Sequence, residues 1–192
     1  MAEAVEQERR ITLAEFEQRV AAAADGRRLE LVDGRIVMMS NPTETHEQIV
    51  SNLGAPLKLA MDGRNCRTYL GGMRVQANDD LGRFDGCRPD IVVRCGPRSD
   101  RTWITDPVVV VEVLSPSTMD VDRGRKLWFY KSLASVSHIL LIYTDQMRVE
   151  HYRRTDGDWS MEVLTRPGDD LVLDAVAYRI DLGRIYFDLP IG

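Results

Sequence analysis

The sequence has no long hydrophobic run. No window of this 192-residue chain approaches the roughly 18 consecutive apolar residues that a membrane-spanning helix needs. The charged stretch at the N-terminus lacks an apolar signal core followed by a cleavage site. Hydrophobic residues make up 44% of the chain and charged residues 29%, as in ordinary soluble domains. We therefore expect one globular domain over residues 1–192, located in the cytoplasm and without membrane contact.

Cysteine is scarce as well. Cys66, Cys87 and Cys95 are the only three, they form no C-x-x-C pair, and any disulfide leaves one of them unpaired. This pattern argues against a zinc ribbon and against a secreted disulfide scaffold, so we expect three free thiols. The sequence also lacks a glycine-rich nucleotide-phosphate loop, a nucleophile elbow and the H-E-x-x-H zinc motif, which removes three common enzyme classes.

Positive charge is in short supply. The chain has 25 Lys and Arg against 30 Asp and Glu, for a net charge of -5. That balance excludes binding to nucleic acid through bulk electrostatics, so any such contact has to be local. Two local groups of basic residues exist, and by default each is interpreted as solvated surface. The first contains Arg123, Arg125, Lys126 and Lys131, and the second contains Arg148, Arg153 and Arg154.

The pattern of apolar residues predicts alternating strands and helices. Asp33-Gly34 between two apolar runs predicts a hairpin, because this pair tolerates the positive φ of a tight turn. Pro56 predicts a kink or an interrupted turn in the second helix, which we expect to begin at Thr45. The expected helices are 12–23, 45–60 and 121–134, and the expected strands are 28–32, 35–39, 68–76, 90–94, 107–114, 138–143, 148–153 and 159–164.

The strands at 107–114 and 138–143 with the helix at 121–134 have the order of one crossover unit. Parallel strands need such a connection, so we expect these two strands to be parallel and central. Gly71-Gly72 is expected to form a bulge within the strand at 68–76. The predicted fold class is α/β, with a mixed β-sheet flanked by helices.

Glu112 is an ionisable residue in a valine run apolar enough to be buried on both faces. An isolated ionised carboxylate is costly there, so Glu112 needs a cation. One alternative is an ion pair with a basic residue such as Arg88. The other is a metal ion shared with Asp90, which begins a neighbouring apolar strand. Two carboxylates at the ends of adjacent strands suit Mg²⁺ or Mn²⁺.

A lysine on the following helix is the third element. Asp122, Lys126 and Tyr130 are spaced four residues apart and so share one helix face. If this face leans over the strand end, the Lys126 ammonium reaches a metal-bound water or a phosphate oxygen. The alternative is a surface ion pair between Asp122 and Lys126, which contributes only a few tenths of a kcal/mol.

The same residues carry a family resemblance. The motifs are Arg-Pro-Asp90, Val-Val-Glu112-Val-Leu-Ser-Pro-Ser-Thr118, and Asp122-Arg-Gly-Arg-Lys126 with Tyr130 and a following Ile-Leu-Leu-Ile-Tyr strand. Over residues 12–164 the chain resembles the Uma family of putative restriction endonucleases, part of the PD-(D/E)XK nuclease superfamily. The resemblance implies a restriction-endonuclease-like core in which Asp90 and Glu112 bind a divalent metal.

One position departs from the superfamily pattern, which places a lysine two residues after the second acid, where this chain has Leu114. The resemblance implies that Lys126 replaces that lysine. Glu30, in Leu-Glu-Leu-Val-Asp-Gly, resembles an additional N-terminal acid of the family. His46 also matches a family position, although a histidine at a helix start is more typical of a cap or a packing residue.

The function that the resemblance implies is metal-dependent hydrolysis of DNA phosphodiester bonds by an endonuclease. The implied catalytic residues are Asp90, Glu112, Lys126 and Glu30, and Mg²⁺ or Mn²⁺ would be held by Asp90, Glu112, Glu30 and the Val113 carbonyl. A homodimer is expected for an enzyme that cuts both strands. The alternative is a non-catalytic nucleic-acid-binding or protein-interaction module with a degraded site, which Leu114 and the negative net charge favour. Hydrolysis of a smaller phosphoester is a third interpretation.

Overall fold

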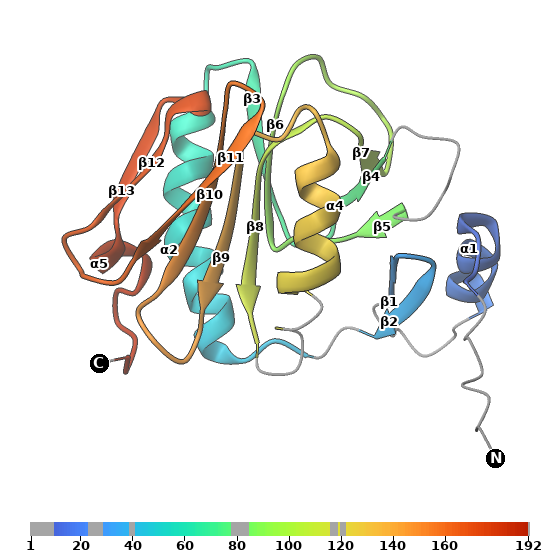
Figure 1. Cartoon of the computed structure of the whole chain (residues 1–192), viewed down its shortest axis with the longest axis horizontal. Helices are drawn as coiled ribbons and strands as arrows, with labels where there is room; N and C mark the ends of the chain where they lie inside the picture. The colour runs from blue at the N-terminus through green and yellow to red at the C-terminus, as the bar shows by residue number, and fades with distance from the viewer. Residues whose placement is uncertain are drawn as a thin grey trace.

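A computed structural model describes residues 10–22, 29–38, 41–77, 85–115, 119 and 122–191. Its centre is a six-stranded sheet with the order β11-β10-β9-β8-β6-β3 (Figure 1). The two middle strands are parallel neighbours, as the sequence predicts, and every other neighbouring pair is antiparallel. The strands are β3 (Cys66–Leu70), β6 (Ile91–Cys95), β8 (Pro107–Leu114), β9 (His138–Tyr143), β10 (Val149–Thr155) and β11 (Asp158–Leu164).

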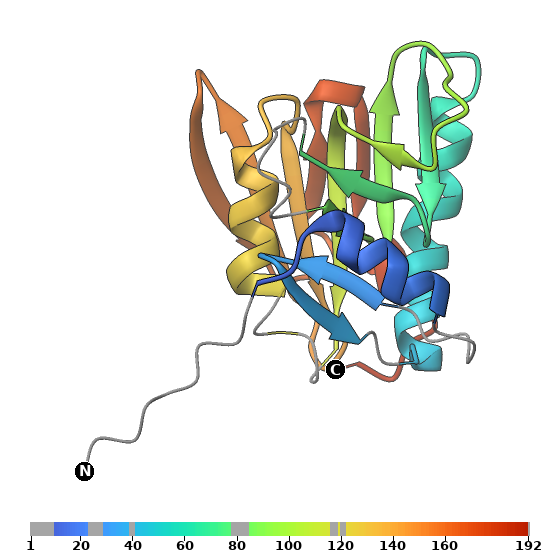
Figure 2. The ribbon, with the colours of Figure 1, turned by 90° about the vertical axis from the view of Figure 1, so that its right-hand side faces the viewer.

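Helices cover both faces of this sheet, and Figure 2 shows the strands between them. One face carries α2 (Glu44–Met61), and the other carries η1 (Asp122–Lys126) with α4 (Leu127–Ser132). Side chains of a strand alternate between its faces, so β8 contributes to two cores. Val109, Val111 and Val113 pack on the α2 side, whereas Val110 and Leu114 pack on the α4 side. Glu112 therefore points toward α4.

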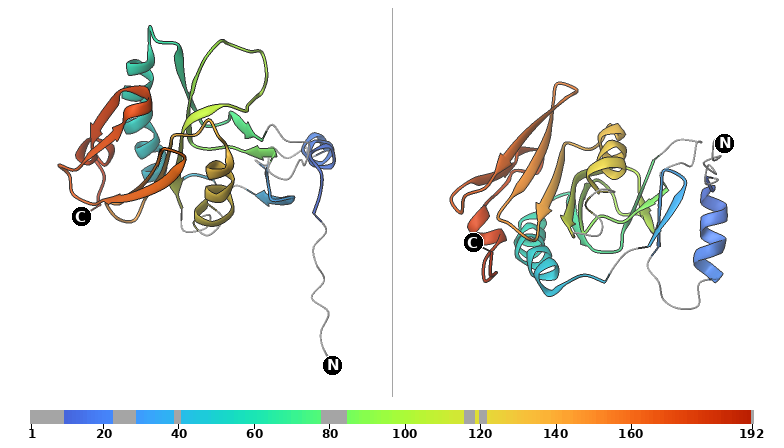
Figure 3. Two further views of the ribbon diagram at one scale, coloured as in Figure 1. Left: turned by 45° about the horizontal axis from the view of Figure 1, so that its top comes forward. Right: turned by 60° about the horizontal axis from the view of Figure 1, so that its bottom comes forward.

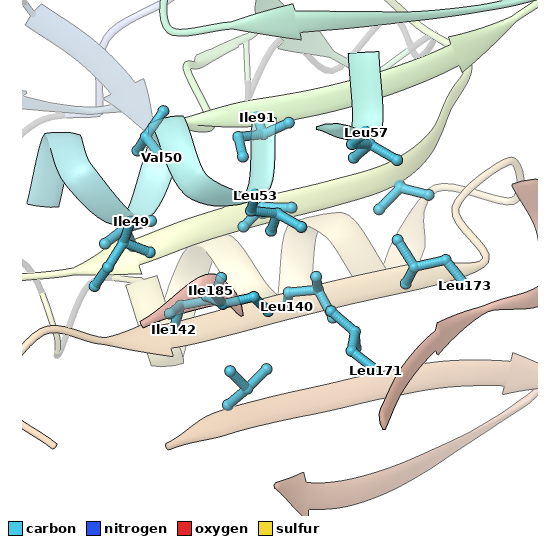
Figure 4. Close-up of a cluster of buried hydrophobic side chains, with 14 of the residues drawn as sticks. Ile49, Val50, Leu53, Leu57, Ile91, Leu140, Ile142, Leu171, Leu173 and Ile185 are labelled. Atoms are coloured by element: carbon cyan, nitrogen blue, oxygen red, sulfur yellow. The ribbon is translucent and has the colours of Figure 1, made fainter. Parts of the chain in front are cut away.

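The core on the α2 side also holds the C-terminal part of the chain. Figure 4 shows side chains of α2, β9 and the C-terminal segment converging, with Leu53, Leu140 and Leu171 among them. This segment contains β12 (Asp170–Leu173), η2 (Asp174–Val176), β13 (Tyr178–Asp181) and α5 (Leu182–Ile185). β12 and β13 pair antiparallel, and in both views of Figure 3 they lie at the end of the molecule away from α1. We predicted no element beyond residue 164.

The N-terminal part lies on the other side of the molecule (Figure 1). The predicted hairpin is present, with φ of 51° at Asp33 and 70° at Gly34, the positive values of a two-residue primed turn. The elements of this part are α1 (Leu13–Ala22), β1 (Leu29–Val32) and β2 (Arg35–Met38). A small three-stranded sheet accompanies them, formed by β4 (Arg74–Gln76), β5 (Asp85–Cys87) and β7 (Trp103–Ile104).

Several expected boundaries were wrong. Thr43 caps α2 through its side chain, and the helix continues past Pro56 without interruption. Residues 68–76 form not one bulged strand but β3 and β4, which belong to different sheets. Gly71 and Gly72 separate them with φ of 45° and 122°, values that turn the chain out of the first sheet. The helix predicted at 121–134 is a five-residue π-helical turn followed by a short α-helix. Val121 and the motif residues 116–118 lie outside the described ranges.

The expectation of three free thiols was also wrong. Cys66 and Cys95 form a disulfide across β3 and β6, where they occupy directly paired positions. They are 29 residues apart in sequence, so only the strand register reveals that they meet. Cys87 is a free, buried thiol. Within the part of the chain that the structure describes, no helix is both long enough and apolar enough to cross a membrane.

Candidate active site

Glu112 lies in the middle of a buried polar cluster on the α4 face of the sheet. Its side chain is only 4% exposed, and its neighbours along β8 are two valines. The hydroxyl of Tyr130 donates a hydrogen bond of 2.6 Å to Glu112 Oε1, and Lys126 Nζ lies 3.4 Å from the same oxygen. The cation that this carboxyl group requires is therefore present, and it comes from η1.

Lys126 contacts three carboxyl groups. Its Nζ lies 2.7 Å from Glu30 Oε2 and 3.0 Å from Asp122 Oδ1, in addition to Glu112. All four side chains are at most 5% exposed. The pair between Asp122 and Lys126 is thus buried, not a surface pair. Three carboxyl groups surround one ammonium group, so full ionisation would leave an excess of two negative charges in a dry environment.

This excess is reflected in the pKa values. Burial raises the pKa of Glu112 well above its usual value, and the charges of Asp122, Asp90 and Glu30 raise it further against the opposing effect of Lys126. Burial alone would lower the pKa of Lys126, but Glu112, Glu30 and Asp122 outweigh it and raise that pKa well above normal. The surroundings therefore favour the charged form of Lys126 and the protonated form of Glu112.

Asp90 lies just before β6 (Ile91–Cys95), at the edge of this cluster. Its Oδ2 accepts a hydrogen bond of 2.7 Å from the backbone N–H of Val113, which fixes it beside Glu112. His46 Nε2 lies 3.3 Å from the same oxygen. Burial acts to lower the pKa of His46, but the hydrogen bond and charge of Asp90 prevail and raise it. With side chains 16% and 12% exposed, Asp90 and His46 mark the most accessible side of the site.

Glu30 reaches the cluster from the N-terminal hairpin. Its Oε1 accepts the backbone N–H of Arg88, and its Oε2 contacts Lys126. The first turn of α2 supplies His46, whose backbone N–H is held by Thr43 at the cap. The structure therefore brings together all residues singled out in the sequence, Glu30, His46, Asp90, Glu112, Val113 and Lys126. Of the two alternatives for Asp122 and Lys126, the surface ion pair is wrong, because the pair is buried beside Glu112.

The donor chemistry of the site fits a hard divalent cation. The ion-pair partners of the ammonium group among the described residues are carboxyl oxygens, and Asp122 Oδ1 has its ion pair with Lys126 at 3.0 Å but makes no further hydrogen bond within the described residues. The same residues contain no group of three or more His, Cys, Asp and Glu side chains arranged to hold a metal ion. Mg²⁺ sites often use just one or two carboxylates and keep several waters, and Asp90 and Glu112 are carboxyl groups that could supply such a set.

Comparisons with known proteins identify the family of this chain. The profile of the Uma2 family, described as "Putative restriction endonuclease", matches residues 13–183. Two uncharacterized proteins of Synechocystis are 32% and 28% identical over 160 and 159 residues. These alignments cover 82% and 80% of this chain and 82% and 87% of the relatives.

A solved structure resembles the whole fold. The crystal structure of a putative nuclease belonging to DUF820 from Anabaena variabilis superposes with a TM-score of 0.75. The match covers 92% of this chain and 97% of that chain at 20% sequence identity. At this identity the likeness establishes the fold alone. The predicted α/β class, with a mixed sheet flanked by helices, is confirmed.

Proposed function

Since this chain belongs to the Uma2 family, we propose that it is a metal-dependent endonuclease that hydrolyses phosphodiester bonds of DNA. The observation that carries the proposal is the excess of buried carboxyl groups around Lys126. Buried charges are normally paired one to one, because each unpaired charge loses its hydration without compensation. A site with two surplus carboxyl groups is suited to a divalent cation, and a site at a strand end in a nuclease fold is suited to phosphate chemistry.

In the proposal, Asp90, Glu112 and the carbonyl of Val113 hold Mg²⁺ or Mn²⁺. A divalent ion bound there lowers the pKa of a water molecule and polarises a phosphoryl oxygen. Asp90 is suited to this role because the Val113 N–H and His46 fix its orientation. Glu112 is suited to it because Tyr130 holds one of its oxygens in place.

Lys126 stabilises the negative charge that develops on the phosphate in the transition state. The carboxyl groups around Lys126 raise its pKa and so favour the charged form, which suits charge stabilisation better than a role as general base. Glu30 has protein partners on both oxygens, so its part is to position Lys126. These assignments make Lys126 the functional replacement for the lysine that is absent at Leu114.

The experiment that tests this proposal is a calorimetric titration of Mn²⁺ into the purified protein. Metal binding does not require knowledge of the DNA sequence that is cut. The variants Asp90→Asn and Glu112→Gln remove one negative charge each with little change in volume, and both are expected to abolish saturable binding. Glu162→Gln is the matched control, because Glu162 is a strand carboxylate that contacts His151 on the outer edge of the sheet.

A second candidate function remains in competition. The side chains of Glu30, Glu112, Asp122 and Lys126 are nearly inaccessible and already contact one another, which favours a non-catalytic nucleic-acid-binding or protein-interaction module. Absence of Mn²⁺ binding by the wild type would select this module. Binding that is lost in both variants but retained in Glu162→Gln selects the nuclease, whose cleavage of plasmid DNA with Mg²⁺ is then measured beside Lys126→Met.

The proposal extends to a homodimer acting in the cytoplasm, because cutting both strands of a duplex at one locus takes two active sites. Light scattering is expected to give twice the 21.8 kDa mass of one chain. A mass equal to one chain would remove the dimer from the proposal and leave the chemistry of the site unaffected.

A further inference from the structure

A second buried glutamate lies on the same face of the sheet. Glu150, on β10, has a side chain only 1% exposed and accepts hydrogen bonds from four side chains. Arg123 Nη2, Arg148 Nη2 and the Tyr143 hydroxyl donate to Oε1 over 3.0, 3.1 and 2.8 Å, and the Tyr152 hydroxyl donates to Oε2 over 3.1 Å. Burial acts to raise the pKa of Glu150, but these donors lower it on balance. Glu150 is therefore a fixed, ionised carboxylate.

The two arginines come from separate parts of the chain. Arg123 belongs to η1 and Arg148 immediately precedes β10, so the two basic groups seen in the sequence meet at one carboxylate. The ring of Tyr143 lies near both guanidinium groups, with the Cζ atoms of Arg123 and Arg148 6.0 and 5.3 Å from its centroid. The two guanidinium groups are thus held by hydrogen bonds and by cation–π contacts with one ring.

The position of this cluster relative to the candidate active site follows from the strand register. Leu141 on β9 pairs with Glu112 on β8 on one side and with Glu150 on β10 on the other. Directly paired residues point to the same face of a sheet, so both glutamates face α4. Two strand spacings separate their backbones by about 10 Å. Successive residues of η1 complete both clusters, since Asp122 contacts Lys126 beside Glu112 and Arg123 contacts Glu150.

The charge of the second cluster has the opposite sign from the first. Two guanidinium groups share one carboxylate, which leaves one positive charge in excess. The carboxylate is buried, but the side chains of Arg123 and Arg148 are 47% and 31% exposed. A guanidinium group has five N–H donors, and its hydrogen bond to Glu150 uses one of them. Paired, preoriented arginines of this kind match the geometry of a phosphate group.

We propose that Arg123 and Arg148, positioned by Glu150 and Tyr143, bind a backbone phosphate of DNA within a few nucleotides of the one at the carboxylate cluster. This inference rests on the proposed function, because it assigns part of the same substrate. A duplex strand carries one phosphate per roughly 3.4 Å of helix axis, so a distance of about 10 Å corresponds to a few nucleotides. The arginines also supply the local positive charge that a chain with net charge -5 needs to approach DNA.

The experiment measures binding of a fluorescein-labelled 20-base-pair DNA duplex by anisotropy, with EDTA present so that no metal-dependent cleavage occurs. Wild type, Arg123→Gln, Arg148→Gln and the double variant are titrated between 50 and 200 mM salt. Each substitution is expected to weaken binding about tenfold and to reduce the slope of log K against log salt by about one. Arg179→Gln is the matched control, since Arg179 is an exposed arginine on β13 at the far end of the molecule.

Glu150→Gln separates positioning from bulk charge. This variant keeps both arginines and makes the protein more positive by one charge, so a purely electrostatic patch would bind the duplex more tightly. Loss of positioning predicts the reverse, several-fold weaker binding at every salt concentration. Circular dichroism and thermal unfolding of each variant verify that the protein is folded under the binding conditions.

The outcomes distinguish the two proposals. If both arginine variants bind DNA like Arg179→Gln, or if the wild type binds no duplex at 50 mM salt, the phosphate site is wrong. Mn²⁺ titration of the Arg123→Gln/Arg148→Gln protein is expected to match the wild type, because neither arginine contacts the carboxylate cluster residues in the proposed metal site. Normal DNA binding with no metal binding would instead reject the nuclease and keep the phosphate site.

Discussion

Glu112 on β8 and Glu150 on β10 are two buried glutamates on one sheet face, and both pair with Leu141 of the strand between them, β9. Glu112 shares one lysine with two other carboxyl groups, and its pKa is raised. Glu150 accepts hydrogen bonds from two arginines and two tyrosines, and its pKa is lowered. Neither side chain is accessible to solvent, but burial is the largest influence on the pKa of Glu112, whereas the four donors around Glu150 outweigh the effect of burial there.

This difference indicates that the two clusters have different roles. A carboxyl group with too few partners is able to take up a further cation, whereas a carboxylate with surplus donors holds those donors in place for another ligand. Both conditions are costly to maintain in a dry interior, which favours a functional explanation for each. Three experiments probe the contrast, beginning with the one that should have the largest effect.

Removing the shared cation should damage the first cluster most. Lys126→Met leaves Glu30, Glu112 and Asp122 without an ammonium group, and we expect a loss of about 3–5 kcal/mol in the free energy of unfolding. Urea denaturation at pH 7 measures it. Lys58→Met, at an exposed position of α2, is the control and should change stability by less than about 0.5 kcal/mol. If Lys126→Met is as stable as this control, the three buried carboxyl groups do not depend on the ammonium group of Lys126.

The two glutamates should respond to pH in opposite directions. The raised pKa of Glu112 means that the folded protein binds more protons than the unfolded chain above pH of about 4.3, so the stability from Glu112 falls as pH rises toward its folded pKa. The pKa of Glu150 is lower in the folded protein than in the unfolded chain. Glu150 therefore stabilises the folded protein above pH of about 4.3, and this stabilisation is lost as the pH falls through the pKa that Glu150 has in the folded protein.

Urea denaturation of the wild type, Glu112→Gln and Glu150→Gln in EDTA between pH 3 and 8 would resolve these slopes. The stability of wild type relative to Glu112→Gln should decrease with rising pH, and that relative to Glu150→Gln should decrease with falling pH. Slopes of the same sign would show that the surroundings of the two glutamates do not differ as described.

The tyrosines should have the smallest effects. Tyr130→Phe removes the hydroxyl donor to Glu112, and Tyr143→Phe removes one of four donors to Glu150. We expect a cost of about 1 kcal/mol for Tyr130→Phe and less for Tyr143→Phe, because Glu150 keeps three donors and the ring keeps its contacts with the arginines. Thermal unfolding compares the stability of the two variants at one pH. If Tyr143→Phe loses as much stability as Tyr130→Phe or more, Glu112 does not depend on its hydroxyl donor more than Glu150 does.

Local sequence signals predicted much of the scaffold. Asp33-Gly34 fixed the N-terminal hairpin through its positive φ values, and the valine run with the strand at 138–143 gave the parallel centre of the sheet. The spacing of Asp122, Lys126 and Tyr130 correctly placed all three side chains on one face toward Glu112. These features depend on residues close in sequence, so their patterns can be recognised without knowledge of the fold.

The errors concern residues that meet only through tertiary register. The disulfide between Cys66 and Cys95 depends on the alignment of β3 with β6, which no local pattern encodes. Arg123 and Arg148 were interpreted as parts of two separate surface groups because Glu150, which joins them, was not singled out within the predicted strand at 148–153. The C-terminal hairpin had only a weak signal, the short apolar run Leu171-Val172-Leu173 between two aspartates, in which Leu171 and Leu173 are buried.

Glu30 is translated well before the lysine that it contacts in the folded protein. Glu30 leaves the ribosome about 100 residues before Lys126, which at about 5–20 residues per second corresponds to roughly 5–20 s. During that interval the nascent chain contains Glu30 without its ammonium partner, and β8 with Glu112 is added only near its end. The polar cluster is therefore completed only after most of the polypeptide has been translated, and truncated translation products should lack the assembled site.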